Sequence, residues 1–302
     1  MFEHLLVPLD GSRLAEVALP AATYIAEITG ADITLLHVLE ENPPQAVHGD
    51  HHLTTVDEAC IYLAATAESL PPSVVVKEHA HPNEEHDVAH SIVTHAREMK
   101  IELIVMCTHG RGNLRRLLFG TIAQKVIALG ATPVLLIPPM TDGTSRTQPF
   151  TCRRILVPLD GDPAHEAGLK TAAGMASICG ASLYLVVVVP TLSTLAGEDS
   201  AAAKLLPTTA ATILDMSEQQ ALDYLGQHVE SLRARGVTVG AEVRRGNPAT
   251  AIVQAAEEAG VDLVAMATHG KTHLDAFWSG SVTPKVSRST RLPLLLVPAA
   301  ES

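Results

Sequence analysis

The chain contains one sequence pattern twice. The segment His4–Gly11 returns as Arg154–Gly161 with a common Leu-Val-Pro-Leu-Asp-Gly ending, and Cys107–Gly110 returns as Ala267–Gly270. Solenoid proteins repeat units of about 20–50 residues, whereas these copies lie about 150 residues apart, which is the size of a whole domain. The repeat therefore predicts two domains of one fold.

The first domain is expected at residues 1–139 and the second at residues 153–302. Residues 140–152 between them are rich in Pro, Thr and Gly and show no periodicity, which is typical of a linker. Each domain closes on an apolar run between prolines, Pro133–Pro138 and Pro293–Pro298. These closing runs are candidate sheet edges, which proteins usually cover.

Within each copy, short apolar runs alternate with longer amphipathic segments. The expected strands are residues 4–8, 32–38, 74–78, 102–106 and 133–137, then 154–158, 182–189, 237–243, 262–266 and 293–297. The expected helices are residues 13–29, 54–69, 85–99 and 121–129, then 163–179, 209–235, 248–259 and 281–290. Runs such as Ile104–Met106 are apolar on both faces, as buried parallel strands are. This alternation predicts the α/β class: two tandem open parallel five-stranded sheets with helices on both faces, Rossmann-like in arrangement.

The first helix of each copy has a recognisable start. Ser12 follows Asp10-Gly11 as an expected N-cap, and Asp162 takes that role in the second copy, with Pro163 as the first helical residue. Pro20 falls inside the first of these helices and should kink it, because proline has no backbone N–H to donate.

The composition excludes several classes of function. The formal net charge of −12 disfavours binding to nucleic acid or to anionic lipid, and an aromatic content of 3% leaves little material for stacking bases. The four cysteines have no paired spacing, which suggests reduced thiols in the cytoplasm. We expect no signal peptide and no membrane-spanning segment, since the longest strongly apolar run, Leu183–Val189, is too short to cross a bilayer.

Three segments of each copy should meet at the carboxyl edge of its sheet, where open parallel sheets bind ligands. In the first copy they are Val7–Ser12, His37-Val38, and the glycine-containing stretch from Cys107 to Asn113 that leads to Gly120-Thr121. Glycines let a phosphate approach the backbone closely, and a hydroxyl group at a helix start adds a donor beside unsatisfied N–H groups. Arg111, with Arg115 and Arg116, adds positive charge. This pattern favours a nucleotide site, although such turns also occur in sheets that bind nothing.

The whole chain except the linker resembles a tandem universal stress protein. Nucleotide-binding members of that family carry Gly, two residues, Gly, nine residues, then Gly followed by Ser or Thr. The present chain has the second and third glycines in both copies, and it has Cys107 and Ala267 where the first should stand. The resemblance implies an adenine-nucleotide α-hydrolase-like fold that binds ATP, with Mg²⁺ as its counterion. The residues that match the nucleotide-binding positions are Asp10, Val38, Gly110, Arg111, Gly120 and Thr121 in the first copy, and Asp160, Val188, Gly270, Lys271, Gly280 and Ser281 in the second.

The resemblance also implies a function and an assembly. The nucleotide would tune conformation or partner choice in a stress response, and the two domains would pair about a pseudo-twofold axis through their closing strands, with further association into a homodimer. Two alternatives remain open: an interaction module with empty pockets, and a slow ATPase. His109 and His269 lie in the glycine loops without a nucleophile at catalytic spacing, so we expect no catalysis beyond slow hydrolysis.

The two copies differ in one turn and in histidine content. Gly246-Asn247-Pro248, a turn typical of the family, corresponds to His86-Asp87-Val88 in the first copy, where Glu84 and Glu85 add acidic charge beside an expected phosphate path. Histidines gather in the first copy. The candidates for a transition-metal site are His48, His51 and His52 in one loop and His86 and His90 one helical turn apart, against the alternative of a solvated polar surface.

Overall fold

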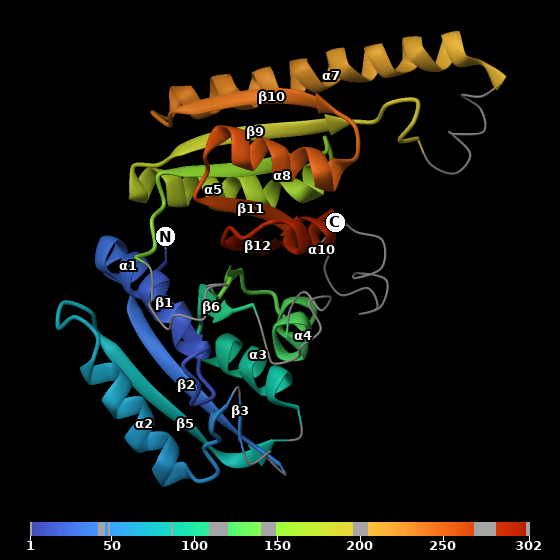
Figure 1. Ribbon diagram of the computed structural model, residues 1–302. Coiled ribbons are helices and arrows are strands. Elements are labelled where there is room, and N and C mark those ends of the chain that lie inside the picture. Colours follow the sequence, from blue (N-terminus) through green and yellow to red (C-terminus); the bar gives the residue numbers. More distant parts are fainter. Residues whose placement is uncertain are drawn as a thin grey trace. The chain divides into compact units, whose positions relative to one another are not determined.

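The computed structural model describes residues 2–41, 46–47, 49–85, 87–108, 120–139, 149–195, 205–268 and 282–299. Their contacts divide the chain into two compact units (Figure 1). Of the described residues, those up to 151 and 292–298 form the first unit, and residues 152–268, 282–291 and 299 form the second. The domain boundaries expected from the sequence stay a prediction.

The first unit is built on a parallel sheet in the order β5-β2-β1-β6-β7. These strands are β1 (His4–Pro8), β2 (Asp32–Glu40), β5 (Val76–Glu85), β6 (Leu103–Cys107) and β7 (Val134–Ile137). The strand β12 (Leu294–Pro298), from the far end of the chain, is part of the same unit. It pairs antiparallel with β7, so that Leu295 lies opposite Leu135. The chain leaves β1 toward β2 and β5 and later returns to β6 on the other side, which puts the topological switch point between β1 and β6.

Helices cover both faces of this sheet (Figure 1). They are the 3₁₀ turn η1 (Ala15–Ala18), α1 (Leu19–Thr29), α2 (Val56–Glu68), α3 (Val88–Glu98) and α4 (Thr121–Leu129). Right-handed crossovers place α1 and α2 on one face and α3 and α4 on the other. A short hairpin of β3 (Ala46–Val47) and β4 (Asp50–His51) lies between β2 and α2. The core is aliphatic, with Leu5, Leu6 and Ile104 fully buried.

The second unit repeats this plan with a parallel sheet in the order β10-β9-β8-β11. Its strands are β8 (Arg154–Leu159), β9 (Ser182–Val189), β10 (Val239–Arg245) and β11 (Leu263–Thr268). Its helical elements are η2 (Pro163–Glu166), α5 (Ala167–Cys179), α7 (Pro207–Ala234), α8 (Pro248–Ala259) and α10 (Val282–Ser289). No helix in the described ranges combines the length and the apolar character that crossing a bilayer requires.

The α/β fold with parallel strands and helices on both faces is confirmed, but the first helix of each unit differs from expectation. Each begins with a separate 3₁₀ turn, η1 or η2, before the α-helix. Asp162 does cap η2, accepting a hydrogen bond from the Ala164 N–H at 2.9 Å. The expected kink at Pro20 is wrong, because α1 begins at Leu19 and places this proline in its first turn. At that position the missing N–H of proline costs nothing.

Candidate functional site

The turn that leaves the first strand of each unit has the same backbone conformation. Gly11 has a φ of +84° and Gly161 a φ of +82°, in the left-handed region where a side chain is strained. In the first unit the Asp10 Oδ1 accepts hydrogen bonds from the Ser12 N–H at 3.0 Å and from its hydroxyl at 2.6 Å. The repeated Asp-Gly pair is thus a structural requirement of this turn as well as a candidate for ligand binding.

The two turns differ in what surrounds them. In the first unit the Arg13 N–H donates to Asp50 at 3.1 Å, and a side chain added at Gly11 would meet Leu53 at 2.8 Å. At Gly161 such a side chain would have no neighbour within 4 Å, and Asp160 is exposed. Among the described residues, the segment Asp50–Leu53 therefore covers the turn of the first unit, while the turn of the second has no such neighbour.

A different contact occupies the aspartate of the second unit. His165 Nδ1 lies 2.6 Å from the Asp160 Oδ2, and the Asp162 N–H donates to the Oδ1 at 3.0 Å. Any base or ribose that bound Asp160 would have to share its carboxylate with these two groups. Position 15, which corresponds to His165 in the first copy, is an alanine and offers no such partner.

Two histidines are buried near the turn of the first unit, His37 in β2 and His52 within the covering segment itself. His37 and His52 are each only 1% exposed, and the His37 Nδ1 donates to the Leu9 carbonyl oxygen at 2.8 Å. Burial lowers the pKa of His37, and neighbouring His52 lowers it further, which outweighs the opposing effects of the Leu9 hydrogen bond and of the Asp10 and Glu40 carboxylates. His37 is therefore held neutral beside Asp10, at the place where the sequence predicts the base and ribose.

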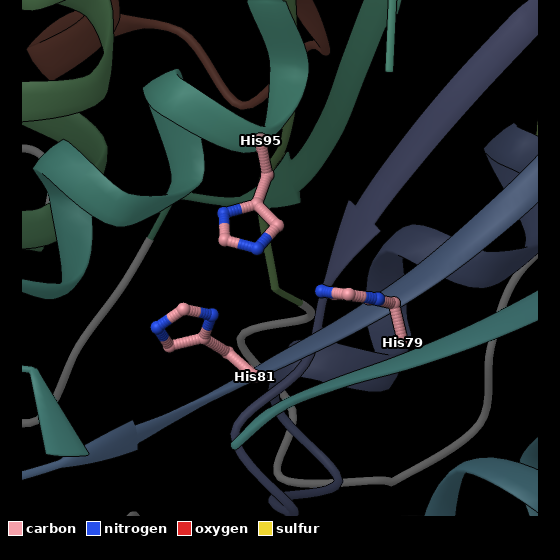
Figure 2. Close-up of side chains that lie close together, drawn as sticks. All are labelled: His79, His81 and His95. Carbon is pink, nitrogen blue, oxygen red and sulfur yellow. The ribbon is translucent and has the colours of Figure 1, made fainter. Parts of the chain in front are cut away.

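The histidines named as metal candidates do not come together among the described residues. His51 is exposed and lies 3.6 Å from Glu58, His52 is buried, and His90 is exposed on α3. His48 and His86 lie outside the described residues. A different set, His79, His81 and His95, brings three ring nitrogens within 4.8 Å of one another (Figure 2). The sequence signal for this set was the alternation of His79 and His81, which puts both on one face of a strand.

The start of α4 is fixed to the end of β6. The Gly120 N–H donates to the Thr108 carbonyl oxygen at 2.8 Å, and the Thr108 N–H donates to Ile137 at 3.0 Å. Gly120 is the N-cap residue with a φ of −55°, and Thr121 is the exposed first residue of the helix. The Thr121 hydroxyl thus stands at a helix N-terminus on the carboxyl edge of the sheet.

A cavity of 250 Å³ opens at this edge. It is lined by the end of β2, the start of α3 and the start of α4, through Glu40, Glu41, Asp87, Val88, Ala89, Thr121, Ile122 and Lys125. Asp87 caps α3 by accepting from the His90 N–H at 3.3 Å, and it pairs with Lys125 at 3.0 Å. Burial opposes the ionisation of Asp87, but hydrogen bonds from Lys125 and the His90 N–H outweigh it and hold the pKa of this carboxyl below its usual range.

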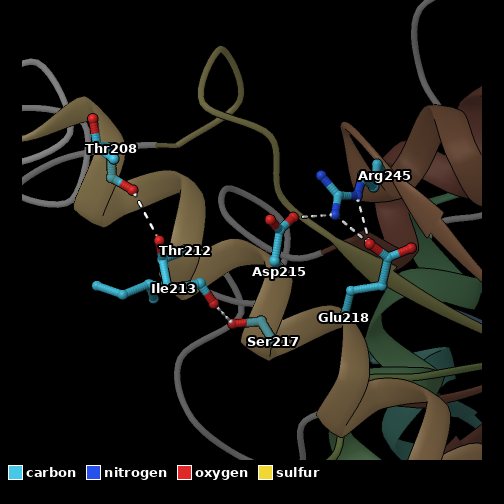
Figure 3. A network of polar contacts seen from close by, with 7 residues as sticks. All are labelled: Thr208, Thr212, Ile213, Asp215, Ser217, Glu218 and Arg245. Carbon is cyan, nitrogen blue, oxygen red and sulfur yellow. Dashed lines mark hydrogen bonds and ion pairs between the residues drawn. The ribbon is translucent and has the colours of Figure 1, made fainter.

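A cavity in the second unit has a different character. Its volume is 340 Å³, and its lining residues are Thr191, Leu192, Ser193, Ala211, Leu214, Asp215 and Arg245. Arg245 pairs with Asp215 at 2.7 Å and also with Glu218 (Figure 3). This guanidinium is already bound by two carboxylates of α7, so an anionic ligand would have to displace them.

The remaining expected residues divide into two groups. Val38 is 6% exposed in β2, and Val188 is half-buried in β9. Gly110, Arg111, Gly270, Lys271, Gly280 and Ser281 lie outside the described residues. The roles of all these residues stay predictions. Glu40, Glu41 and Lys125 were missed as lining residues, since nothing in their sequence neighbourhood marks them.

Comparison with known proteins agrees with the repeat. The model of the universal stress protein family matches twice, at residues 1–138 and 151–298. Universal stress protein YxiE of Bacillus subtilis is 30% identical over 149 residues, which cover 45% of this chain and 99% of that protein. Universal stress protein Slr1230 of Synechocystis is 22% identical over 321 residues, which cover 97% of this chain and 99% of that protein.

The fold agrees as well. The crystal structure of a universal stress protein from Archaeoglobus fulgidus covers 98% of each chain with a TM-score of 0.70 and 18% identity. The two family matches together take in nearly the whole sequence and coincide with its two copies. The chain therefore belongs to the universal stress protein family, as a tandem of two such domains.

Proposed function

We propose that this protein binds an adenine nucleotide, ATP with Mg²⁺, at the carboxyl ends of its parallel strands, in a cytoplasmic stress response. The bound nucleotide would bias conformation or partner choice, with at most slow hydrolysis. The observation that carries this proposal is the cavity of 250 Å³ in which the end of β2 meets the N-termini of α3 and α4. It lies on the sheet edge where folds of this type bind ligands.

The donors for a phosphate come from α4. Its unsatisfied N–H groups and helix dipole favour an anion, and the Thr121 hydroxyl and the Lys125 ammonium line the same cavity. At 250 Å³ the cavity is smaller than the usual ligand pocket of about 300–1,000 Å³, so it would hold only part of an ATP molecule. We therefore assign the cavity to the phosphates and place the base and ribose toward Asp10 and Val38.

The acceptors in the same cavity explain why Mg²⁺ belongs to the proposal. Glu40, Glu41 and Asp87 face the space that a phosphate would enter, and Lys125 is already paired with Asp87. Carboxylates repel a bare phosphate but suit Mg²⁺, which is usually bound by one or two of them together with substrate phosphates. Binding of ATP should therefore depend strongly on Mg²⁺.

The nucleotide content of the purified protein tests the proposal first. The protein is heat-denatured, and chromatography of the supernatant measures the amount of adenine nucleotide per chain. Calorimetric titration with Mg-ATP then detects binding even if the nucleotide is lost during purification. Thr121→Val keeps the β-branched shape but removes the hydroxyl, which should weaken binding by about tenfold or more, as for a hydrogen bond to a charged group. Thr212→Val, on the exposed part of α7, is the matched control and should bind as the unmodified chain does.

An empty protein that gives no heat with Mg-ATP would overturn the nucleotide proposal and leave the interaction module. That alternative has its own observation in the second unit. The helix α7 exposes Ile213 by 57%, Met216 by 59% and Leu222 by 47%, side chains that are usually buried. Release of phosphate at a rate that Gly120→Ala abolishes would instead favour the slow ATPase.

A further inference from the structure

Three histidines of the first unit converge from two elements. His79 and His81 are alternate residues of β5 and share one face of that strand, and His95 projects toward them from α3 (Figure 2). The ring centroids of His79 and His95 are 4.8 Å apart, as are those of His81 and His95. One ring nitrogen from each residue lies within 4.8 Å of the other two.

The environment of two of these rings favours a ligand over simple core packing. The His95 Nδ1 donates to the Ser91 carbonyl oxygen at 2.9 Å, which leaves the lone pair on its Nε2. Metal-binding histidines are usually oriented by such a bond from the other nitrogen. The Nε2 of His79 is buried and has no hydrogen-bond partner among the described residues. A buried polar atom without a partner is costly unless something else binds it.

We propose that His79, His81 and His95 form a binding site for one divalent transition-metal ion, with zinc as the preferred ion. Three imidazoles without a carboxylate suit zinc, copper or nickel, and do not suit Mg²⁺ or Ca²⁺. With Zn–N bonds of about 2.0–2.1 Å, a tetrahedral ion separates its ligand nitrogens by about 3.3 Å. Small rotations of the side chains would close the observed spacing, and a fourth position would remain for water or another ligand.

The protonation state is compatible with this role. Burial, followed by the neighbouring His95 and His81, lowers the pKa of His79. The neutral imidazole is the form that binds a metal ion. Among the described residues, His79, His81 and His95 are the one set of three histidine, cysteine or carboxylate side chains whose ligand atoms lie close enough together to hold a metal ion.

The second unit provides an internal control. By strand register, His79 lies beside Leu36 and His81 beside Val38, while Glu242 and Arg244 lie beside the corresponding Val186 and Val188. His95 corresponds to Ala255, which is fully buried. Arg244 pairs there with Glu242, and with Glu258 at 2.6 Å. The second unit thus holds an ion pair where the first holds three imidazoles, so we expect one metal ion per chain.

The test uses the untagged full-length chain, stripped with a chelator and then titrated with Zn²⁺ alone against a competing chromophoric chelator. We expect one tight equivalent per chain. His79→Ala and His81→Ala should each weaken this binding by more than about tenfold, since even the loss of an outer-shell partner costs 10- to 100-fold. His90→Ala is the matched control, because His90 is exposed on the same helix as His95 and lies outside the group.

A second measurement guards against misfolding. Each variant should have the circular dichroism and the unfolding midpoint of the metal-free unmodified chain, and Co²⁺ should give the strong visible absorption of a four-coordinate site only where all three histidines are present. The proposal is overturned if the unmodified chain binds no stoichiometric Zn²⁺, if His79→Ala and His81→Ala bind as tightly as it does, or if His90→Ala loses as much affinity as they do. No nucleotide is present, so the outcome is independent of the proposed ATP site.

Discussion

At the scale of single residues, the two copies give the same turn different surroundings. His37 is buried and donates to the Leu9 carbonyl oxygen, whereas the corresponding residue of the second copy is Val187, 6% exposed. The first unit thus carries a buried titratable group at a position where the second carries an ordinary core residue. This difference affects the pH dependence of stability more than it affects the fold.

His37→Val introduces the residue of the second copy and removes this group. Because burial lowers the pKa of His37 in the folded state, the unfolded state binds its proton more readily, and stability falls as the pH drops below about 6.5. The variant should lose about 1 kcal/mol at pH 8 through the missing hydrogen bond. It should also lose less stability than the unmodified chain between pH 8 and pH 5, as measured by urea unfolding at both values. An equal loss in both proteins would contradict this, and His90→Ala is the control with an exposed histidine.

The residues of the candidate sites show how far a sequence can predict a site. Asp10-Gly11 and Asp160-Gly161 could be identified because the turn requires a glycine at positive φ and the repeat marks it twice. His79, His81 and His95 stand out in the sequence only as part of a longer group of histidines with His86 and His90, and their convergence could not be predicted, for a physical reason. The apolar run that predicts β5 ends at residue 78, but the strand continues to Glu85 through backbone pairing with β2. Polar residues that extend a strand through backbone pairing leave no hydrophobic pattern, so the alternation of His79 and His81 does not by itself identify a strand face.

At the scale of elements, the capping residues at the helix N-termini determine which charged groups lie at the carboxyl edge of each sheet. Asp87 caps α3 in the first unit and Asn247 caps α8 in the second, each accepting a backbone N–H at 3.3 Å three residues on. Asp and Asn are equivalent as caps, so the fold does not require the charge. The sequence predicted both helices, but it could not show that the Asp87 carboxylate also binds Lys125 of α4.

Asp87→Asn should separate these two roles. The cap is retained, so the free energy of unfolding should change by no more than about 0.5 kcal/mol, whereas Asp87→Ala should lose about 1 kcal/mol. With the negative charge gone and Lys125 released, Mg²⁺-free ATP should bind about fivefold more tightly, equivalent to about 1 kcal/mol. Calorimetry with and without Mg²⁺ would measure this. Unchanged affinity for Mg²⁺-free ATP in Asp87→Asn would show that this carboxylate does not face the phosphates.

At the scale of the whole molecule, the first unit depends on a strand from the far end of the chain. β12 pairs with β7, whose residues Val134–Ile137 are all buried. A piece ending at residue 139 would lack β12 and present an apolar strand with unpaired backbone groups, a template for association. We expect residues 1–139 alone to self-associate in light scattering at concentrations where the full chain keeps a constant mass. A monomeric piece over the same range would show that the β7 edge tolerates solvent.

The net charge of −12 on the whole molecule repels ATP, whereas the donors at the start of α4 attract its phosphates. A helix N-terminus and one lysine attract an anion over a few ångströms only. The field of the net charge extends over about one Debye length, which is about 30 Å in 10 mM salt and about 8 Å in 150 mM salt. Salt should therefore screen the repulsion and raise the association rate of Mg²⁺-free ATP severalfold between these conditions, as followed by stopped-flow fluorescence of a labelled analogue. Proteins that bind nucleic acid show the opposite salt dependence, because a positive field attracts their ligand. A rate that falls with salt would mean that a positive surface near the site outweighs the charge of the chain as a whole.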